Sequence, residues 1–191
     1  MFLKSFVHRA AQLAAPHLRA FLALFALGLA PLTELQAQPV RSLLEIRHER
    51  VIIQAWDTSC AAAALATVLT YALDDPISEK AVAQAMLRKT DPLRVKVRGG
   101  FSLLDMKRFV EGRGYSATGF RDLDFQELVA MRNPIVPIEE YGGPHFVVFR
   151  GVRAGLVDIA DPAFGNRHMP VARFLEVWRQ GIGFIVTRAK S

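Results

Sequence analysis

Cysteine is nearly absent from this sequence, since the 191 residues contain only Cys60. An intramolecular disulfide is therefore excluded, and so is a structural zinc site built from several cysteines. The histidines and carboxylates have no ligand-like spacing either, so the sequence predicts neither a metal nor another cofactor. Glycine and proline, at 13 and 10 residues, are too ordinary in number for a collagen-like or low-complexity chain.

The sequence also lacks a basic run interleaved with aromatic residues. Its 24 lysines and arginines exceed its 18 acidic residues and give a net charge of +6, but the arginines are scattered along the chain. Nucleic-acid binding therefore has little support. The hydrophobic fraction of 51% and the 13 phenylalanines argue against disorder. The length suits one domain with a substantial core rather than two.

The first forty residues have the parts of a secretory signal peptide. Residues 1–19 are basic, residues 20–30 form an uncharged apolar run, and a small residue, Ala37, follows the break at Pro31. We predict a signal peptide over residues 1–37 and a single domain over residues 38–191, located in the periplasm or exported further. An uncleaved signal would instead anchor the chain, although the apolar run is shorter than the roughly 20 residues that span a bilayer. Membrane contact is expected only through this segment.

Cleavage would remove three basic residues and one acidic residue, which lowers the net charge from +6 to +4. In the remaining chain the patterns predict helices first and an antiparallel sheet second, an α+β fold. Helices are expected at residues 61–73, 78–87 and 170–178, from Ser102 to Gly112, and from Asp122 or Asp124 to Pro134. Strands are expected at residues 51–53, 135–138, 145–152, 156–160 and 183–188, and the short gap after residue 152 predicts a hairpin.

Cys60 lies where the chain enters the predicted helix 61–73. Unpaired N–H groups give a helix N-terminus partial positive charge, which favours a thiolate over a thiol. A nucleophilic cysteine needs this stabilisation and a base beside it. In the string Cys-Ala-Ala-Ala-Ala-Leu, Cys60 is also compatible with an inert thiol in the core, since buried cysteine is common.

His145 is the strongest candidate for the base. It begins the predicted strand 145–152 directly after Gly142-Gly143-Pro144, and a polar ring at the mouth of an apolar strand suits a residue that faces a cleft. His48 lies in a poorly patterned segment and His168 in a predicted loop. The alternative is a strand-end His145 that faces solvent.

Asp161 ends the second strand of the predicted hairpin. A hairpin places the start of one strand beside the end of the next, so the Asp161 carboxylate can lie beside His145 and fix the tautomer of its imidazole. Strand alternation points Asp158 to the other face, which makes it the weaker candidate. The alternative for Asp161 is a turn, because Asp-Pro is a common turn opener.

Gln54 precedes Cys60 by six residues. Its side-chain amide, together with the backbone N–H of Cys60, would stabilise the oxyanion of a tetrahedral intermediate. A glutamine before a helix means little by itself, but the combination of Gln54, Cys60, His145 and Asp161 is more specific than its parts.

The order glutamine, cysteine, histidine, aspartate resembles that of papain-like cysteine peptidases. The strings QAWDTSCAAAAL, PHFVV and DPAFG, at residues 54–65, 144–148 and 161–165, resemble the bacteriocin-processing family that cleaves double-glycine leaders. The resemblance covers residues 51–188 and implies a compact papain-like fold. It implies four roles: Cys60 as nucleophile, His145 as general base and acid, Asp161 as the residue that orients His145, and Gln54 as oxyanion donor.

Two features depart from the pattern of this family. Ala61 follows the nucleophile where the family usually has glycine, and its extra methyl could crowd a bound carbonyl. No transporter domain accompanies the peptidase-like region in these residues. The chain is therefore similar to the standalone exported members, in particular those encoded with functional-amyloid secretion systems.

This resemblance implies an exported cysteine endopeptidase that cleaves a secreted peptide or protein, after small residues of a leader, through a thioester acyl-enzyme. The expected partners are this substrate and a component of a secretion system. Two other functions stay open. One is a weakly active or inactive module that binds an export substrate, for which Ala61 is the only sign, and the other is acyl transfer from the same thiol to an amine.

Overall fold

Residues 40–140 and 142–189 are described by the computed structural model. The predicted signal peptide, residues 1–37, therefore lies outside the described residues, and its cleavage stays a prediction. In the described part of the chain, no helix is long and apolar enough to cross a membrane.

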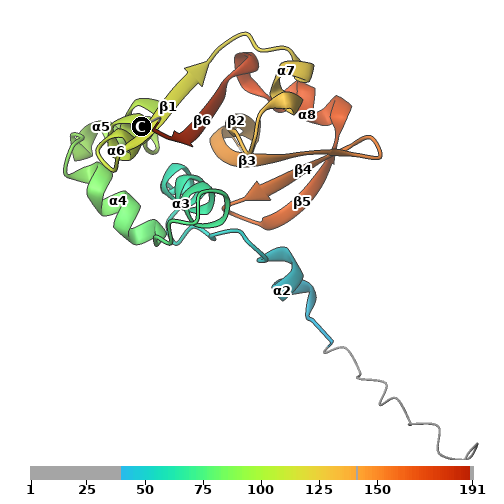
Figure 1. Ribbon diagram of the computed structural model, residues 1–191, viewed down its shortest axis with the longest axis horizontal. Helices are drawn as coiled ribbons and strands as arrows, with labels where there is room; N and C mark the ends of the chain where they lie inside the picture. The colour runs from blue at the N-terminus through green and yellow to red at the C-terminus, as the bar shows by residue number, and fades with distance from the viewer. Residues whose placement is uncertain (1–39, 141, 190–191) are drawn as a thin grey trace, which may run out of the picture. The chain divides into compact units, whose positions relative to one another are not determined.

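Helices dominate the first half of the described chain (Figure 1). Three begin where predicted, because Ser78, Ser102 and Asp124 each accept a hydrogen bond from a backbone N–H of the first turn. The helix predicted from residue 61 begins at Cys60 itself. Two short helices, α2 and α5, were not predicted. The helices are α2 (Leu43–Arg47), α3 (Cys60–Ala72), α4 (Glu79–Leu87), α5 (Pro92–Arg98), α6 (Leu103–Glu111), α7 (Phe125–Ala130) and α8 (Val171–Val177), with a 3-10 helix η1 (Arg179–Gly181).

The strands form an antiparallel sheet with the order β1-β6-β2-β3-β4-β5. The predicted hairpin is present as β3 and β4. The two edge strands, β1 and β5, were not predicted. The strands are β1 (Tyr115–Phe120), β2 (Ile135–Glu140), β3 (Gly143–Arg153), β4 (Leu156–Asp161), β5 (Gly165–Pro170) and β6 (Gly183–Arg188).

Residues 51–53 form no strand, so that prediction was wrong. The backbone of this segment is engaged elsewhere: the Ile52 N–H donates to Thr67 Oγ1 of α3 at 2.9 Å, and the following Gln54 N–H donates to the Pro162 carbonyl at 2.8 Å. The apolar side chains pack against the core beside α3. The run of β-branched residues therefore reflects burial and not pairing in a ladder.

Helix α3 carries Cys60 at its N-terminal end and packs against β3 (Figure 1). Its first ten residues are all buried, and the four alanines at residues 61–64 are inaccessible to solvent. Small side chains let the helix backbone approach the sheet closely, which places the start of α3 deep in the molecule. This helix and its neighbours α4 and α6 form the first core.

A second core lies on the other face of the sheet. Along β3, Val148 belongs to the first core, whereas Val147 and Phe149 belong to the second, as strand alternation requires. Helices α7 and α8 contribute to the second core, where the rings of Phe149 and Phe174 lie with centroids 5.6 Å apart. The sheet therefore has helices on both faces, and the predicted α+β class is confirmed.

Phe149→Ala is expected to lower the free energy of unfolding by about 3–5 kcal/mol. The Phe149 ring is 1% exposed and contacts the rings of Phe125 and Phe174, so truncation leaves a cavity among aromatic side chains. Chemical denaturation measures the loss. Leu175→Ala, at an exposed position of α8, is the control and is expected to change stability by less than about 0.5 kcal/mol. Equal losses for the two variants would contradict this account of the second core.

Candidate active site

Cys60 is the first residue of α3, as the sequence predicted, and its side chain is buried. The N-cap residue Ser59 does not cap the helix with its side chain. Its hydroxyl instead donates to the Trp56 carbonyl at 2.7 Å and accepts from the Trp56 N–H at 3.2 Å. The N-terminal N–H groups of α3 therefore receive no side-chain cap, and their partial positive charge stays directed at Cys60.

The segment before Cys60 is fixed by contacts from two directions. The Ala55 N–H donates to Oε1 of the buried Glu79 in α4 at 3.0 Å. The Gln54 N–H donates to the Pro162 carbonyl, which follows Asp161 directly. These two bonds tie the Gln54 segment to α4 and to the end of the hairpin.

His145 and Asp161 are paired across the hairpin, as predicted. His145 Nε2 lies 2.7 Å from Asp161 Oδ1, the Asp161 side chain is fully buried, and the His145 side chain is only 13% exposed. The solvent-facing alternative for His145 is therefore wrong. Cys60 acts on the same ring, because its side chain lies close enough to raise the pKa of His145. Since Asp161 engages Nε2, Nδ1 is the ring nitrogen left for the thiol.

The charge of this group follows from its surroundings. Burial lowers the pKa of His145, but its hydrogen bonds to Asp161 and Cys60 and the negative charge of both partners outweigh burial and raise the pKa to about 9. Burial raises the pKa of Asp161, but the hydrogen bond and charge of His145, the Ala163 N–H and the charge of Arg167 hold it below its usual range. At neutral pH the site therefore contains an imidazolium between Cys60 and an ionised carboxylate.

Gln54 has an amide with unused hydrogen-bonding capacity. Its Oε1 is buried without a partner, and within residues 40–140 and 142–189 no side chain or carbonyl accepts from its Nε2. An oxyanion is stabilised by a donor, so the relevant group is the Nε2 amide and not Oε1, which can only accept. The unpaired Nε2 N–H groups are those that Gln54 can offer to an oxyanion.

Two residues that the sequence analysis missed complete the surroundings of Asp161. Arg167 Nε donates to Asp161 Oδ2 at 2.8 Å, and Arg167 Nη2 donates to Glu140 Oε2 at 2.5 Å. Arg167 comes from the unpredicted strand β5 and Glu140 from the end of β2. No local pattern marks either residue, because the contact joins positions 27 residues apart.

The other titratable candidates lie outside this group. His168 Nδ1 lies 2.6 Å from Asp158 Oδ1, which makes a second histidine–aspartate pair, but the His168 side chain is 57% exposed. His48 ends α2 and is exposed. Among the described residues, no three side chains of histidine, cysteine, aspartate or glutamate gather into a potential metal site.

A cavity of about 510 Å³ opens beside His145. Its lining combines small residues, among them Gly142, Gly143 and Ala163, with larger or charged ones such as Arg98 and Glu140. A second, more apolar cavity of about 300 Å³ is lined by the exposed Trp56 and, among others, by Ala83, Val95 and Phe101 of the first core. Asp57 lines the cavity beside His145, whereas Trp56 and Thr58 line the apolar one, so both cavities border the segment that leads to Cys60.

Ala61 does not enter the cleft. Its side chain has no exposed surface and belongs to the first core, and it is absent from the lining of the cavity beside His145. The methyl group therefore packs against the interior, and the crowding that the sequence raised as a concern does not follow.

Comparison with known proteins gives two kinds of match. Residues 48–191 match the peptidase C39 family. Two proteins, each called "Probable functional amyloid protease FapD", from Pseudomonas aeruginosa and Pseudomonas fluorescens, are 41% and 38% identical over 148 residues. These matches cover 77% of this chain and 64% of each relative, so the chain spans less than two thirds of the length of these relatives.

Solved structures show the same fold. The peptidase domain of Streptococcus ComA, a bi-functional ABC transporter, has a TM-score of 0.62 at 19% identity and covers 74% of this chain and 100% of that domain. A double glycine motif protease from an AMS/PCAT transporter, solved in complex with a leader peptide, has a TM-score of 0.59 at 26% identity. This match covers 73% of this chain and 91% of that structure. The predicted fold and the resemblance to double-glycine-leader peptidases are confirmed.

Proposed function

This chain belongs to the peptidase C39 family, and on that premise we propose that it is a cysteine peptidase with Cys60 as its nucleophile. The observation that carries the proposal is the buried pair of His145 and Asp161, with Cys60 at the start of α3 close enough to raise the pKa of the imidazole. A thiol at a helix N-terminus, an imidazole that contacts it and a carboxylate that orients the imidazole are the parts that covalent catalysis at sulfur requires.

The first half of the reaction follows from the positions of these groups. The Cys60 thiolate attacks the carbonyl carbon of the scissile peptide, and the Gln54 amide and the Cys60 backbone N–H donate hydrogen bonds to the resulting oxyanion. The intermediate collapses with cleavage of the C–N bond, and the His145 imidazolium gives its Nδ1 proton to the departing amine. The products are a thioester on Cys60 and a free amine.

The second half regenerates the enzyme. His145, now neutral, accepts a proton from water as the water oxygen attacks the thioester carbonyl, and cleavage of the C–S bond releases the carboxylic acid and the Cys60 thiolate. Throughout, the bond from Asp161 to Nε2 keeps that nitrogen protonated and leaves Nδ1 free to exchange a proton with sulfur and water.

The substrate we propose is a secreted peptide or protein cleaved after small residues. The glycines and Ala163 in the lining of the cavity beside His145 support this, and so does the likeness to a double glycine motif protease solved with a leader peptide. The two FapD relatives carry the name functional amyloid protease. We therefore propose that the substrate passes through a secretion system and that the enzyme acts in the periplasm, where its predicted signal peptide would direct it.

Labelling of Cys60 tests the proposal. Since Cys60 is the only cysteine in the sequence, iodoacetamide reports on this thiol alone. Between pH 4 and 9, the wild-type protein is expected to react well below the pKa of about 8.5 of a free cysteine, because the imidazolium stabilises the thiolate. His145→Ala is expected to lose this low-pH reactivity.

His168→Ala is the matched control for that experiment. His168 also pairs with an aspartate, but its ring is exposed and its partner is Asp158. Its removal is expected to leave the labelling profile unchanged. A wild-type profile that resembles a free thiol and does not respond to His145→Ala would refute the peptidase and favour a module that only binds export substrates.

A further inference from the structure

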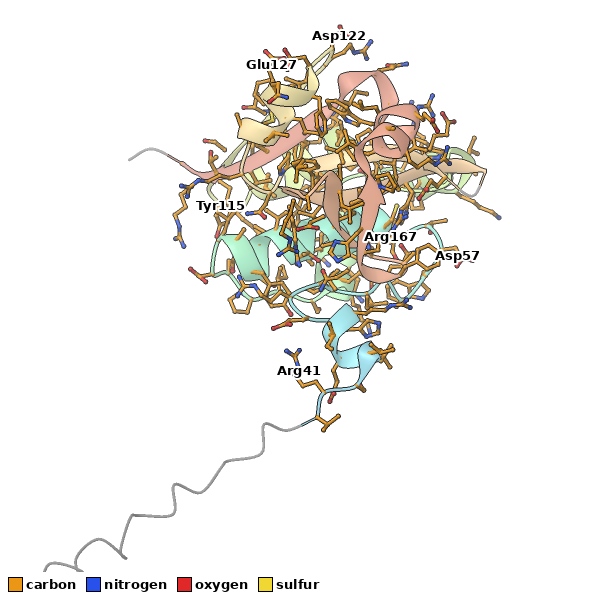
Figure 2. All side chains as sticks on the ribbon, turned by 90° about the vertical axis from the view of Figure 1, so that its right-hand side faces the viewer. Arg41, Asp57, Tyr115, Asp122, Glu127 and Arg167 are labelled. Atoms are coloured by element: carbon orange, nitrogen blue, oxygen red, sulfur yellow. The ribbon has the colours of Figure 1, made fainter. Side chains whose placement is uncertain are left out.

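We propose that Arg167 is a positioning residue of the active site, which holds the Asp161 carboxylate in the orientation and charge state that serve His145. This inference rests on the proposed function, because it assigns Arg167 a role relative to Cys60, His145 and Asp161. Arg167 (labelled in Figure 2) does not touch Cys60 or His145 through any hydrogen bond of the described residues and acts through Asp161.

The two oxygens of Asp161 have separate partners. Oδ1 accepts from His145 Nε2 at 2.7 Å and from the Ala163 N–H at 2.8 Å. Oδ2 accepts from Arg167 Nε at 2.8 Å. A carboxylate held on both oxygens cannot rotate without breaking a hydrogen bond, so Arg167 fixes the plane in which Oδ1 meets the imidazole.

The guanidinium is itself held in place. Its Nη2 donates to Glu140 at 2.5 Å, and its central carbon lies 6.0 Å from the centroid of the Phe164 ring. Its side chain is 21% exposed and that of Glu140 is 11% exposed. An arginine shared between two carboxylates under an aromatic ring is pre-organised, in contrast to an arginine free in solvent.

Electrostatics assign Arg167 a second contribution. The Asp161 side chain is fully buried, and burial alone would favour its protonated form. The positive charge of Arg167 is one of the causes that hold the pKa of Asp161 below its usual range. Burial lowers the pKa of Arg167, but the hydrogen bonds and negative charges of Glu140 and Asp161 outweigh burial and raise the pKa above its usual value. The guanidinium therefore stays charged wherever the enzyme works.

Arg167→Met is therefore expected to change catalysis in a specific way. Because Asp161 loses a neighbouring cation, the pKa of its carboxyl group rises. As the pH is lowered, Asp161 is then protonated at a higher pH than in the wild type, and the imidazolium loses its ionised partner there. The acidic limb of the pH profile, measured by iodoacetamide labelling of Cys60 and by peptide cleavage, is expected to move to higher pH. We also expect a fall in kcat of roughly 10- to 100-fold with a smaller change in KM, because orientation and not binding is lost.

Three further variants separate positioning from the stability of a buried charge. Arg167→Lys restores the charge without the forked geometry and is expected to recover most of the acidic limb. Arg167→Met combined with Glu140→Gln removes the carboxylate left unpaired by the first substitution, so thermal stability is expected to recover while the acidic limb stays displaced. Arg153→Met removes a largely exposed arginine that pairs with Asp158, and it is expected to behave as wild type.

Two results would overturn the role of Arg167. One is an acidic limb of Arg167→Met that coincides with that of the wild type. The other is a double variant, Arg167→Met with Glu140→Gln, whose acidic limb moves back to the wild-type pH when its thermal stability recovers. Failure of the proposed function has a different signature, because the wild-type labelling profile would then match a free thiol and ignore His145→Ala. The two failures are therefore distinguished within one set of measurements.

Discussion

Cys60→Ala is expected to abolish peptide-bond cleavage, with a loss on the order of 10⁵-fold or more in kcat. The reason is that no other thiol exists in the sequence to form the acyl-enzyme, so only the binding and oxyanion contributions to catalysis survive. The measurement is mass spectrometry of the products from a peptide whose leader segment ends in Gly-Gly. Wild type is expected to yield two fragments, and the variant only intact peptide.

Two observations keep this result interpretable. Alanine is smaller than cysteine and continues the alanine run of α3, so the variant is expected to fold, which circular dichroism and thermal melting can verify. Ala61→Gly is the matched control beside it: Ala61 packs in the core and not in the cleft, so this variant is expected to lose about 1 kcal/mol of stability and to retain cleavage. Fragments produced by Cys60→Ala at the wild-type rate would remove Cys60 from the mechanism.

Local sequence patterns predicted the helices that begin at a recognisable capping residue. Ser78, Ser102 and Asp124 are capping residues before amphipathic segments, and each begins a helix. The edge strands β1 and β5 lack such a signal, because most of their residues are at least partly exposed and they carry little apolar alternation. Residues 51–53 show the opposite error, since an apolar run can be buried without joining a sheet.

The candidate site divides in the same way. Cys60 and the pair of His145 and Asp161 follow from a helix start and a short hairpin, both of which are readable from neighbouring residues. Arg167 and Glu140 were missed because their contact depends on β5, which was not predicted, and on a β2 terminus that lies far away in the sequence. Long-range ion pairs of this kind appear only when the register of several strands is known.

Asp161→Asn is expected to lower kcat by about 10²- to 10⁴-fold while leaving the fold intact. Asp161 accepts hydrogen bonds from His145, Ala163 and Arg167, whereas an asparagine amide has one acceptor oxygen and two donors. If the oxygen faces His145, the amide nitrogen opposes the Arg167 N–H. If the oxygen faces Arg167, the amide N–H points at His145 Nε2 and places the imidazole proton on Nδ1, where it blocks proton transfer from Cys60.

The pH dependence of this variant has a definite sign. In the wild type the activity is expected to fall on the alkaline side as His145 loses its proton, at the pKa of about 9 that Asp161 and Cys60 sustain against burial. Without the carboxylate, burial still opposes the charged ring while the hydrogen bond to an anion and its Coulombic attraction are gone. The pKa of His145 is therefore expected to fall, and the alkaline limb of kcat/KM to move to lower pH.

Asp158→Asn distinguishes this effect from a general change in charge. Asp158 lies on the same strand and pairs with the exposed His168 and Arg153, so its neutralisation removes the same charge without touching His145. Its alkaline limb is expected to coincide with that of the wild type, and NMR titration of the His145 ring provides an independent reading of the same pKa. An Asp161→Asn limb that stays at about pH 9 would show that the His145 charge does not depend on this carboxylate, and the contact of 2.7 Å would then serve packing alone.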